Sequence, residues 1–201
     1  MIIQKFTKGP LGNNNYVVMD ENSGEAAIID CTQNPQDMMD FIQQKGGHLK
    51  YVLLTHGHFD HVMGLNKTAD LENVYLSKDD KELLENINDF MDLLNLPHTS
   101  VPKVDVFFEN DTALNLGDHK IQIISTPGHT EGSVCFLIQN YLFSGDTIFK
   151  QSHGRTDFPG GSAKKIYFSL KNLLSLPEDT IVLPGHGPET TIKEERQFYR
   201  K

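Results

Sequence analysis

Residues 55–61 read THGHFDH, which places three histidines and an aspartate within six consecutive positions. Side chains this polar seldom fill a hydrophobic core, so their concentration indicates a binding site. In extended backbone, residues two apart point to the same side, so His56 and His58 can face one ion. If the chain then turns into a helix, Asp60 and His61 can face a second ion. Four ligands exceed what one zinc ion takes from a single loop, so this stretch predicts two metals.

Three further ligand-type side chains follow strand-like runs later in the chain. His129 occurs in STPGHTEGS, Asp146 in LFSGDTIF and His186 in VLPGHGPET. Glycine near each lets the backbone pass close to a site at the end of a rigid strand. A two-metal centre of this kind activates water toward a carbonyl or phosphoryl group. We predict one ion held by His56, His58 and His129, another held by Asp60, His61 and His186, and Asp146 bridging the two.

Hydrophobic patterning around this loop predicts two sets of strands, each closed by helices. Strands are expected at residues 2–6, 15–20, 26–31, 51–55, 73–77, 104–109, 112–116, 120–125, 133–139, 140–144 and 180–184. Helices are expected after Pro35, from about Asp60, over 78–95, around 166–174 and from about Thr191. Residues 13–15, three asparagines, are interpreted as a turn, and the acidic residues of 78–95 as a solvated helix face.

These elements predict an α/β (α+β) fold, a four-layer sandwich with helices outside two packed sheets. A single domain is expected over residues 1–201, with two similar halves that meet near residue 100.

Composition limits the function classes. The net charge of −9 is spread along 201 residues, so neither nucleic acid nor an anionic membrane is an expected partner. No apolar run reaches the roughly 20 residues needed to span a bilayer. The first residues lack the basic-then-apolar pattern of a secretory signal, and two cysteines are too few for a disulfide framework. A cytoplasmic enzyme acting on a small molecule is expected, with no indication of its oligomeric state.

The segments THGHFDH, TPGHTEGS, SGDTIF and PGHGPETT, in this order, resemble the metallo-β-lactamase superfamily. The resemblance covers essentially the whole chain. It implies an αββα sandwich and a centre of two divalent ions, zinc by preference, with iron or manganese also possible. True metallo-β-lactamases have cysteine where Asp146 stands, so the resemblance does not favour antibiotic hydrolysis.

The segments SHGRTDFPGGS and GHGPETTIKEER are similar to the short glyoxalase II-like subgroup. That similarity implies hydrolysis of a thioester such as S-D-lactoylglutathione, with a metal-bridging hydroxide attacking the carbonyl and Asp60 orienting it. The helical extension that grips glutathione in full-length glyoxalase II has no room after residue 201.

Two residues outside the ligand set are candidates for supporting roles. Arg155 and Asp157 correspond to a lysine and a tyrosine of glyoxalase II. Arg155 can bind a substrate carboxylate, or it can form a structural pair with Asp157. Asp30 corresponds to an aspartate that supports the metal loop in the family, and the alternative is an ordinary turn aspartate.

Two other function classes share these motifs. A persulfide dioxygenase, which the segment GRTDF also resembles, would use one Fe(II) held by His56, His129 and Asp146. A non-catalytic metal-binding module is the third class, and it is disfavoured because all seven ligands are present. The intact GHGPETT segment around His186 favours the dinuclear hydrolase.

Overall fold

The computed structural model describes residues 1–67, 71–109 and 111–200, and its core is two six-stranded sheets. The first sheet runs in the order β1 (Ile2–Lys8), β2 (Asn13–Met19), β3 (Glu25–Ile29), β4 (His48–Leu53), β5 (Val74–Ser77) and β6 (Val106–Phe108). The second runs β14 (Thr190–Thr191), β13 (Ile181–Pro184), β10 (Tyr141–Gly145), β9 (Val134–Ile138), β8 (His119–Ser125) and β7 (Leu114–Leu116). A small ribbon pairs β11 (Ile148–Phe149) with β12 (Ser152–His153).

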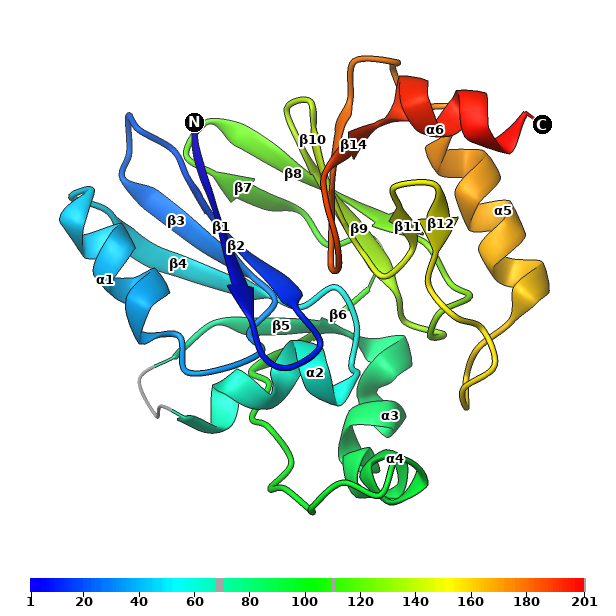
Figure 1. The fold of residues 1–201 in the computed structure, drawn as a ribbon. Helices are drawn as coiled ribbons and strands as arrows, with labels where there is room; N and C mark the ends of the chain where they lie inside the picture. Colours follow the sequence, from blue (N-terminus) through cyan, green and yellow to red (C-terminus); the bar gives the residue numbers. More distant parts are fainter. Residues whose placement is uncertain (68–70, 110, 201) are drawn as a thin grey trace.

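Helices cover the outer faces of both sheets (Figure 1). On the first sheet lie α1 (Gln36–Gln44), α2 (Phe59–Val62), η1 (Met63–Lys67), η2 (Lys78–Asp80), α3 (Lys81–Glu85) and α4 (Ile87–Leu93). On the second lie α5 (Ala163–Leu173) and α6 (Ile192–Tyr199). None of the helices in the described residues combines the length and the apolar character of a membrane-spanning segment.

Alternation along the strands produces the layers. In β2, Val17 packs toward the helices, whereas its neighbour Val18 packs between the two sheets. In β3, Ile28 and Ile29 divide in the same way. Successive side chains of a strand point to opposite faces, so a strand that is apolar at every position is buried on both. The predicted four-layer αββα sandwich is therefore confirmed.

The expectation of one continuous helix over residues 78–95 was wrong. The segment 78–95 is not one helix: it divides into η2, α3 and α4, with Asn86 between the last two in non-helical backbone (φ −101°, ψ 28°). The side-chain amide of Asn86 donates from Nδ2 to the carbonyl of Glu82 (3.0 Å). Asparagine side chains that bond to nearby backbone in this way compete with the hydrogen bonds of a continuous helix. The expected division into two similar halves near residue 100 stays a prediction; β6, which follows that point, pairs in parallel with β5 in the first sheet.

Strand direction positions the site. β4 pairs in parallel with β3, and β10 pairs in parallel with β13. Carboxyl ends of parallel strands meet at one edge of a sheet, so the loops after β10 and β13 lie together. The loop after β4 reaches the same region from the first sheet (Figure 1).

Candidate metal centre

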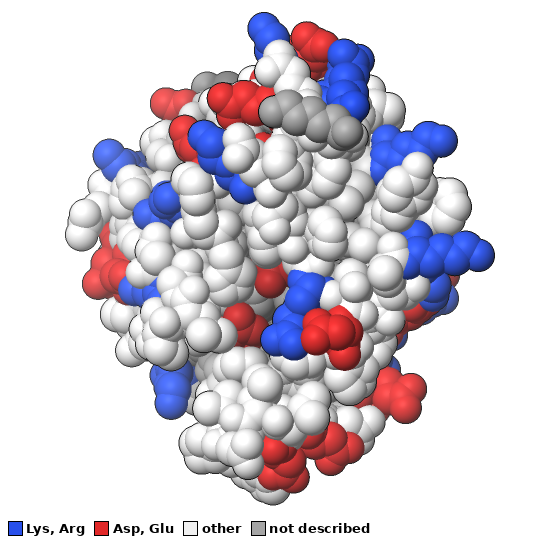
Figure 2. Space-filling model, turned by 45° about the vertical axis from the view of Figure 1, so that its right-hand side comes forward, with Lys and Arg blue, Asp and Glu red and all other residues white. Residues whose placement is uncertain are grey.

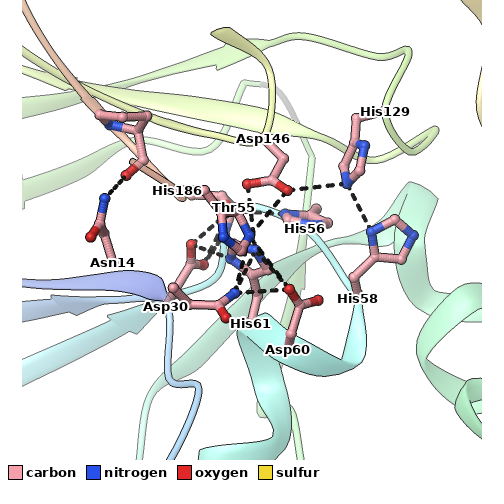
Figure 3. Close-up of polar contacts among 12 residues, drawn as sticks. Asn14, Asp30, Thr55, His56, His58, Asp60, His61, His129, Asp146 and His186 are labelled. Carbon is pink, nitrogen blue, oxygen red and sulfur yellow. Dashed lines mark hydrogen bonds and ion pairs between the residues drawn. The ribbon is translucent and has the colours of Figure 1, made fainter. Parts of the chain in front are cut away.

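All seven predicted ligands converge where the two sheets meet (Figure 3). Their donor atoms form three overlapping groups, and within each group the donors lie within 4.8 Å of one another. The groups are His56, His58 and His129; His56, His61 and Asp146; and Asp60, His61 and His186. The first and third groups are the two ligand sets expected from the sequence.

The backbone after β4 aims the first four candidate ligands in two directions. His58 is extended (φ −67°, ψ 146°) and immediately precedes α2. Asp60 and His61 lie inside α2, whose first turn closes with a bond from His61 N to His58 O (3.0 Å). The change from extended to helical backbone thus separates two ligand pairs within six residues.

Asp146 lies between the two predicted ligand sets. Its Oδ2 is 3.6 Å from Nε2 of His129, in the first set. On the other side, the carboxylate lies 3.5 Å from Nε2 of His61 and 3.5 Å from Nε2 of His186. A carboxylate shared in this way has the position of a bridging ligand.

The polar atoms that remain without partners fit a metal. In the described part of the chain, Nε2 of His56, Nε2 of His58 and Oδ1 of Asp146 are buried and accept or donate no hydrogen bond. Buried polar atoms are nearly always paired, so this concentration calls for another partner. Imidazole nitrogens and carboxylate oxygens are the donors that divalent zinc, iron and manganese bind.

Protonation in the centre also suits metal binding. Burial, reinforced by neighbouring histidines, holds the pKa of His56 and His58 well below 6.5, so both rings are neutral as ligands require. His61 differs: burial opposes its charge, but three surrounding carboxylates outweigh burial and raise its pKa to about 10. A cation at the centre would replace that proton.

Asp30 makes the contacts expected of a residue that orients a ligand. Its Oδ2 accepts from Nδ1 of His61 (2.8 Å), and its Oδ1 accepts from the backbone N of Thr55 (2.8 Å). The Thr55 hydroxyl also donates to this carboxylate (2.9 Å). Asp30 is buried, so these bonds fix the His61 ring with its Nε2 toward the centre.

Asn13 is a site residue that the sequence interpretation missed. Residues 13–15 begin strand β2 and are buried, so their interpretation as a turn was wrong. Asn13 Nδ2 donates to Oδ2 of Asp60 (2.8 Å) and lies 3.3 Å from Nε2 of His61 and 3.2 Å from Nε2 of His186. The asparagines directly precede an apolar run, and that polar start of a strand was the available signal.

Asp80 was also missed, because its acidic neighbours suggested a solvated face. It is 1% exposed and accepts from the backbone N of Gly57 (2.8 Å), the backbone N of Gly132 (2.7 Å) and the hydroxyl of Thr130 (2.8 Å). One carboxylate therefore joins the loop of His58 to the loop of His129. Nothing local in KDDKELLE distinguishes Asp80 from Asp79.

The fold and this centre agree with what the chain is similar to. Residues 9–186 match the metallo-β-lactamase superfamily. The chain belongs to this superfamily. "Probable metallo-hydrolase YqgX" of Bacillus subtilis is 34% identical over 96% of the chain and 93% of that protein. "Hydroxyacylglutathione hydrolase GloC" of Haemophilus influenzae is 33% identical over 88% of the chain and 87% of that protein.

Solved structures from the superfamily superpose closely. The BLEG-1 B3 metallo-β-lactamase has a TM-score of 0.87 at 34% identity, covering 98% of this chain and 97% of that one. TTHA1623 in a di-iron-bound form has a TM-score of 0.84 at 35% identity, covering 97% and 98%. ETHE1 from Myxococcus xanthus has a TM-score of 0.77 at 27% identity, covering 98% and 83%. The general class of the chain is therefore a metal-dependent hydrolase of the metallo-β-lactamase type.

Arg155 combines the two alternatives considered from the sequence. It borders the cavity of about 430 Å³ that opens onto the metal centre. At the same time it donates from Nε to Oδ1 of Asp157 (2.7 Å) and from Nη2 to Oδ2 (2.6 Å). Its guanidinium carbon lies 3.5 Å from the ring centroid of Phe158. Arg155 therefore borders the site with its charge already paired.

Proposed function

We propose that this chain hydrolyses a thioester at a dinuclear centre, as a short glyoxalase II-like enzyme. One observation carries the proposal: Asp146 lies between His129 on one side and His61 and His186 on the other. The similarity to the hydroxyacylglutathione hydrolase GloC supports thioester chemistry.

The centre would take two divalent ions, one on His56, His58 and His129 and the other on Asp60, His61 and His186, with Asp146 shared. Such ions supply a water of lowered pKa and polarise the carbonyl oxygen. In thioester hydrolysis, the water oxygen bonds to the acyl carbon, the carbon–sulfur bond breaks and a water proton passes to the sulfur, which gives a carboxylic acid and a thiol. We favour zinc, and the di-iron form of TTHA1623 supports iron as the alternative.

Asp60 would orient the attacking water. Burial opposes its charge, but the nearby His61 and the hydrogen bonds it receives outweigh burial and hold the pKa of Asp60 below its ordinary value. The carboxylate is consequently ionised at neutral pH. Asn13 fixes one of its oxygens (2.8 Å).

Surface charge supports a small-molecule substrate rather than a nucleic acid. Figure 2 shows one face of the molecule, on which Lys and Arg side chains are dispersed and interleaved with Asp and Glu. Nucleic-acid sites gather basic side chains in a patch or stripe. The net charge of −9 points the same way, and a cytoplasmic location remains part of the proposal.

The test is hydrolysis of two thioesters, S-D-lactoylglutathione and the neutral S-hexanoyl-N-acetylcysteamine, by protein reconstituted separately with zinc and with iron. A kcat/KM above roughly 10⁴ M⁻¹s⁻¹ is expected for at least one of them, together with its loss in Asp146→Ala. Nitrocefin hydrolysis in the same preparations tests the β-lactamase activity named for the BLEG-1 neighbour. Turnover of nitrocefin without turnover of either thioester would overturn the proposal.

A mononuclear Fe(II) persulfide dioxygenase is the second candidate, and the structural similarity to ETHE1 favours testing it. It would hold one ion on His56, His129 and Asp146. Those three do not form one of the compact donor groups among the described residues, whereas both dinuclear sets do. Oxygen uptake with glutathione persulfide by the iron form, without thioester hydrolysis, would decide for this candidate.

A further inference from the structure

The cavity over the metal centre is walled mainly by apolar side chains. Beyond the candidate ligands, six of its lining residues are apolar: Leu11, Phe59, Phe90, Leu94, Phe149 and Phe158. Phe90 stacks on the ring of His58 (4.7 Å between centroids) and meets Phe158 edge to face (4.8 Å). A substrate bound at the metals therefore has an aromatic wall beside it.

A second cavity, of about 280 Å³, adjoins the first. Leu11, Phe59 and Asp60 line both cavities, so the two share a wall beside a candidate metal ligand. The second is lined further by apolar side chains from α4 and the following loop and from η1: Met63, Met91, Leu96 and Pro97. Leu11 stands between the two cavities in the β1–β2 loop and is 56% exposed, so its side chain has room to move.

Charge at the entrance does not favour an anionic substrate. Among the described residues, Arg155 is the one Lys or Arg side chain that lines the first cavity, and Asp157 accepts two hydrogen bonds from its guanidinium. Its flat face packs on Phe158, so a substrate carboxylate would have to compete with Asp157 for the group. Lys67 borders the second cavity, among mostly apolar neighbours.

We propose that the substrate is a thioester with an extended, uncharged apolar arm that passes Leu11 and Phe59 into the second cavity. This inference rests on the proposed thioester hydrolysis and narrows it, because a short hydroxyacyl group would leave the second cavity filled with water. Transfer of apolar surface out of water is favourable, and each buried methylene raises the affinity about fourfold. The arm belongs to either the acyl group or the thiol, and the two sources are separable.

The test uses metal-reconstituted protein and two series of thioesters. In one, acetyl, butyryl, hexanoyl and octanoyl groups are carried on N-acetylcysteamine. In the other, acetyl is carried on ethanethiol, butanethiol, hexanethiol and octanethiol. A rise in kcat/KM of about fourfold per methylene in one series is expected and identifies the side that carries the arm. Equal rates across both series, or faster hydrolysis of the shortest members, would overturn the inference while leaving thioester hydrolysis intact.

A matched pair of leucine variants ties the preference to the second cavity. Leu96→Ser should flatten the dependence on chain length, because Leu96 lines that cavity. Leu93→Ser is the control, since Leu93 is 54% exposed and borders neither cavity. An unchanged slope in Leu96→Ser, or an equal change in both variants, would also count against the second cavity.

Binding of a non-hydrolysable probe separates this inference from the proposed function. The S-butyl and S-octyl thioethers of N-acetylcysteamine are titrated calorimetrically into the metal-loaded protein. Tighter binding of the octyl compound, lost in Leu96→Ser, supports the apolar cavity even if no thioester is hydrolysed. Equal affinity for both thioethers refutes it even if S-D-lactoylglutathione is hydrolysed.

Discussion

A single buried carboxylate fixes the orientation of His61, so we expect Asp30 to control metal affinity. Asp30→Asn keeps the shape but directs an amide donor at Nδ1–H of His61 or at the donors of Thr55. Loss of such a supporting acceptor lowers metal affinity roughly 10- to 100-fold. Competition titration with a zinc-binding dye measures this. Asp20→Asn is the control. Asp20 is also buried, but it follows the end of β2 opposite to Asn13, away from the metal centre, so the substitution should leave the metal affinity unchanged.

The pairing of Arg155 with Asp157 leads to a prediction about substrate charge. Asp157→Ala should release the guanidinium and raise kcat/KM for S-D-lactoylglutathione, which carries carboxylates, by roughly fivefold to tenfold. A neutral N-acetylcysteamine thioester should gain nothing. Asp179→Ala removes the same charge at another exposed position and serves as the control. Equal gains in both variants would mean that only net charge matters.

Residue type and position predicted the candidate ligands but not the residues that hold them. His129, Asp146 and His186 were identifiable because each follows a strand and has glycine nearby. Asn13 and Asp80 act through contacts with residues 23 to 173 positions away. Such contacts depend on how the sheets pack, which local sequence does not encode.

At the scale of elements, the loop after β13 has to bring His186 against Asp146. A Cβ at Gly185 would overlap Oδ1 of Asp146 and the His61 ring, so Gly185→Ala should displace the bridging carboxylate. We expect it to bind about one ion per chain or fewer, measured by elemental analysis after dialysis. Gly187→Ala is the control: its φ of +77° costs roughly 1 kcal/mol, but the added Cβ meets no atom within 4 Å. Two bound ions in both variants would contradict this prediction.

The short helices 78–85 tie two metal loops together through Asp80. Asp80→Ala leaves the buried backbone N–H groups of Gly57 and Gly132 without their acceptor. We expect a loss of roughly 3 kcal/mol in the free energy of unfolding, measured by urea denaturation of the metal-free protein. Asp79→Ala, at the exposed neighbouring position, should change it by less than about 0.5 kcal/mol. Similar stabilities for the two variants would show that the Asp80 contacts contribute little.

For the whole molecule, periodicity predicted the layers well but not every strand's sheet. The apolar runs at β2 and β3 required burial on both faces, and only packed sheets with outer helices provide it. β6 is three residues long, and its place beside β5 depends on parallel pairing across the intervening helices. A strand that short carries too little pattern to choose its sheet.

The metal centre joins the two sheets, so removing metal should destabilise the whole fold. Its candidate ligands come from the loop after β4 in the first sheet and from the loops after β8, β10 and β13 in the second. Metal at 100-fold above its Kd adds about 2.7 kcal/mol per site, and 1 kcal/mol shifts the Tm of a chain this size by roughly 2–4 °C. For two sites, chelation should therefore lower the Tm by roughly 10 °C or more, measured by circular dichroism. The same chelator should shift Asp146→Ala much less, because that variant lacks the shared carboxylate. An unchanged Tm in protein shown to have lost its metal would mean that the sheets hold together without the centre.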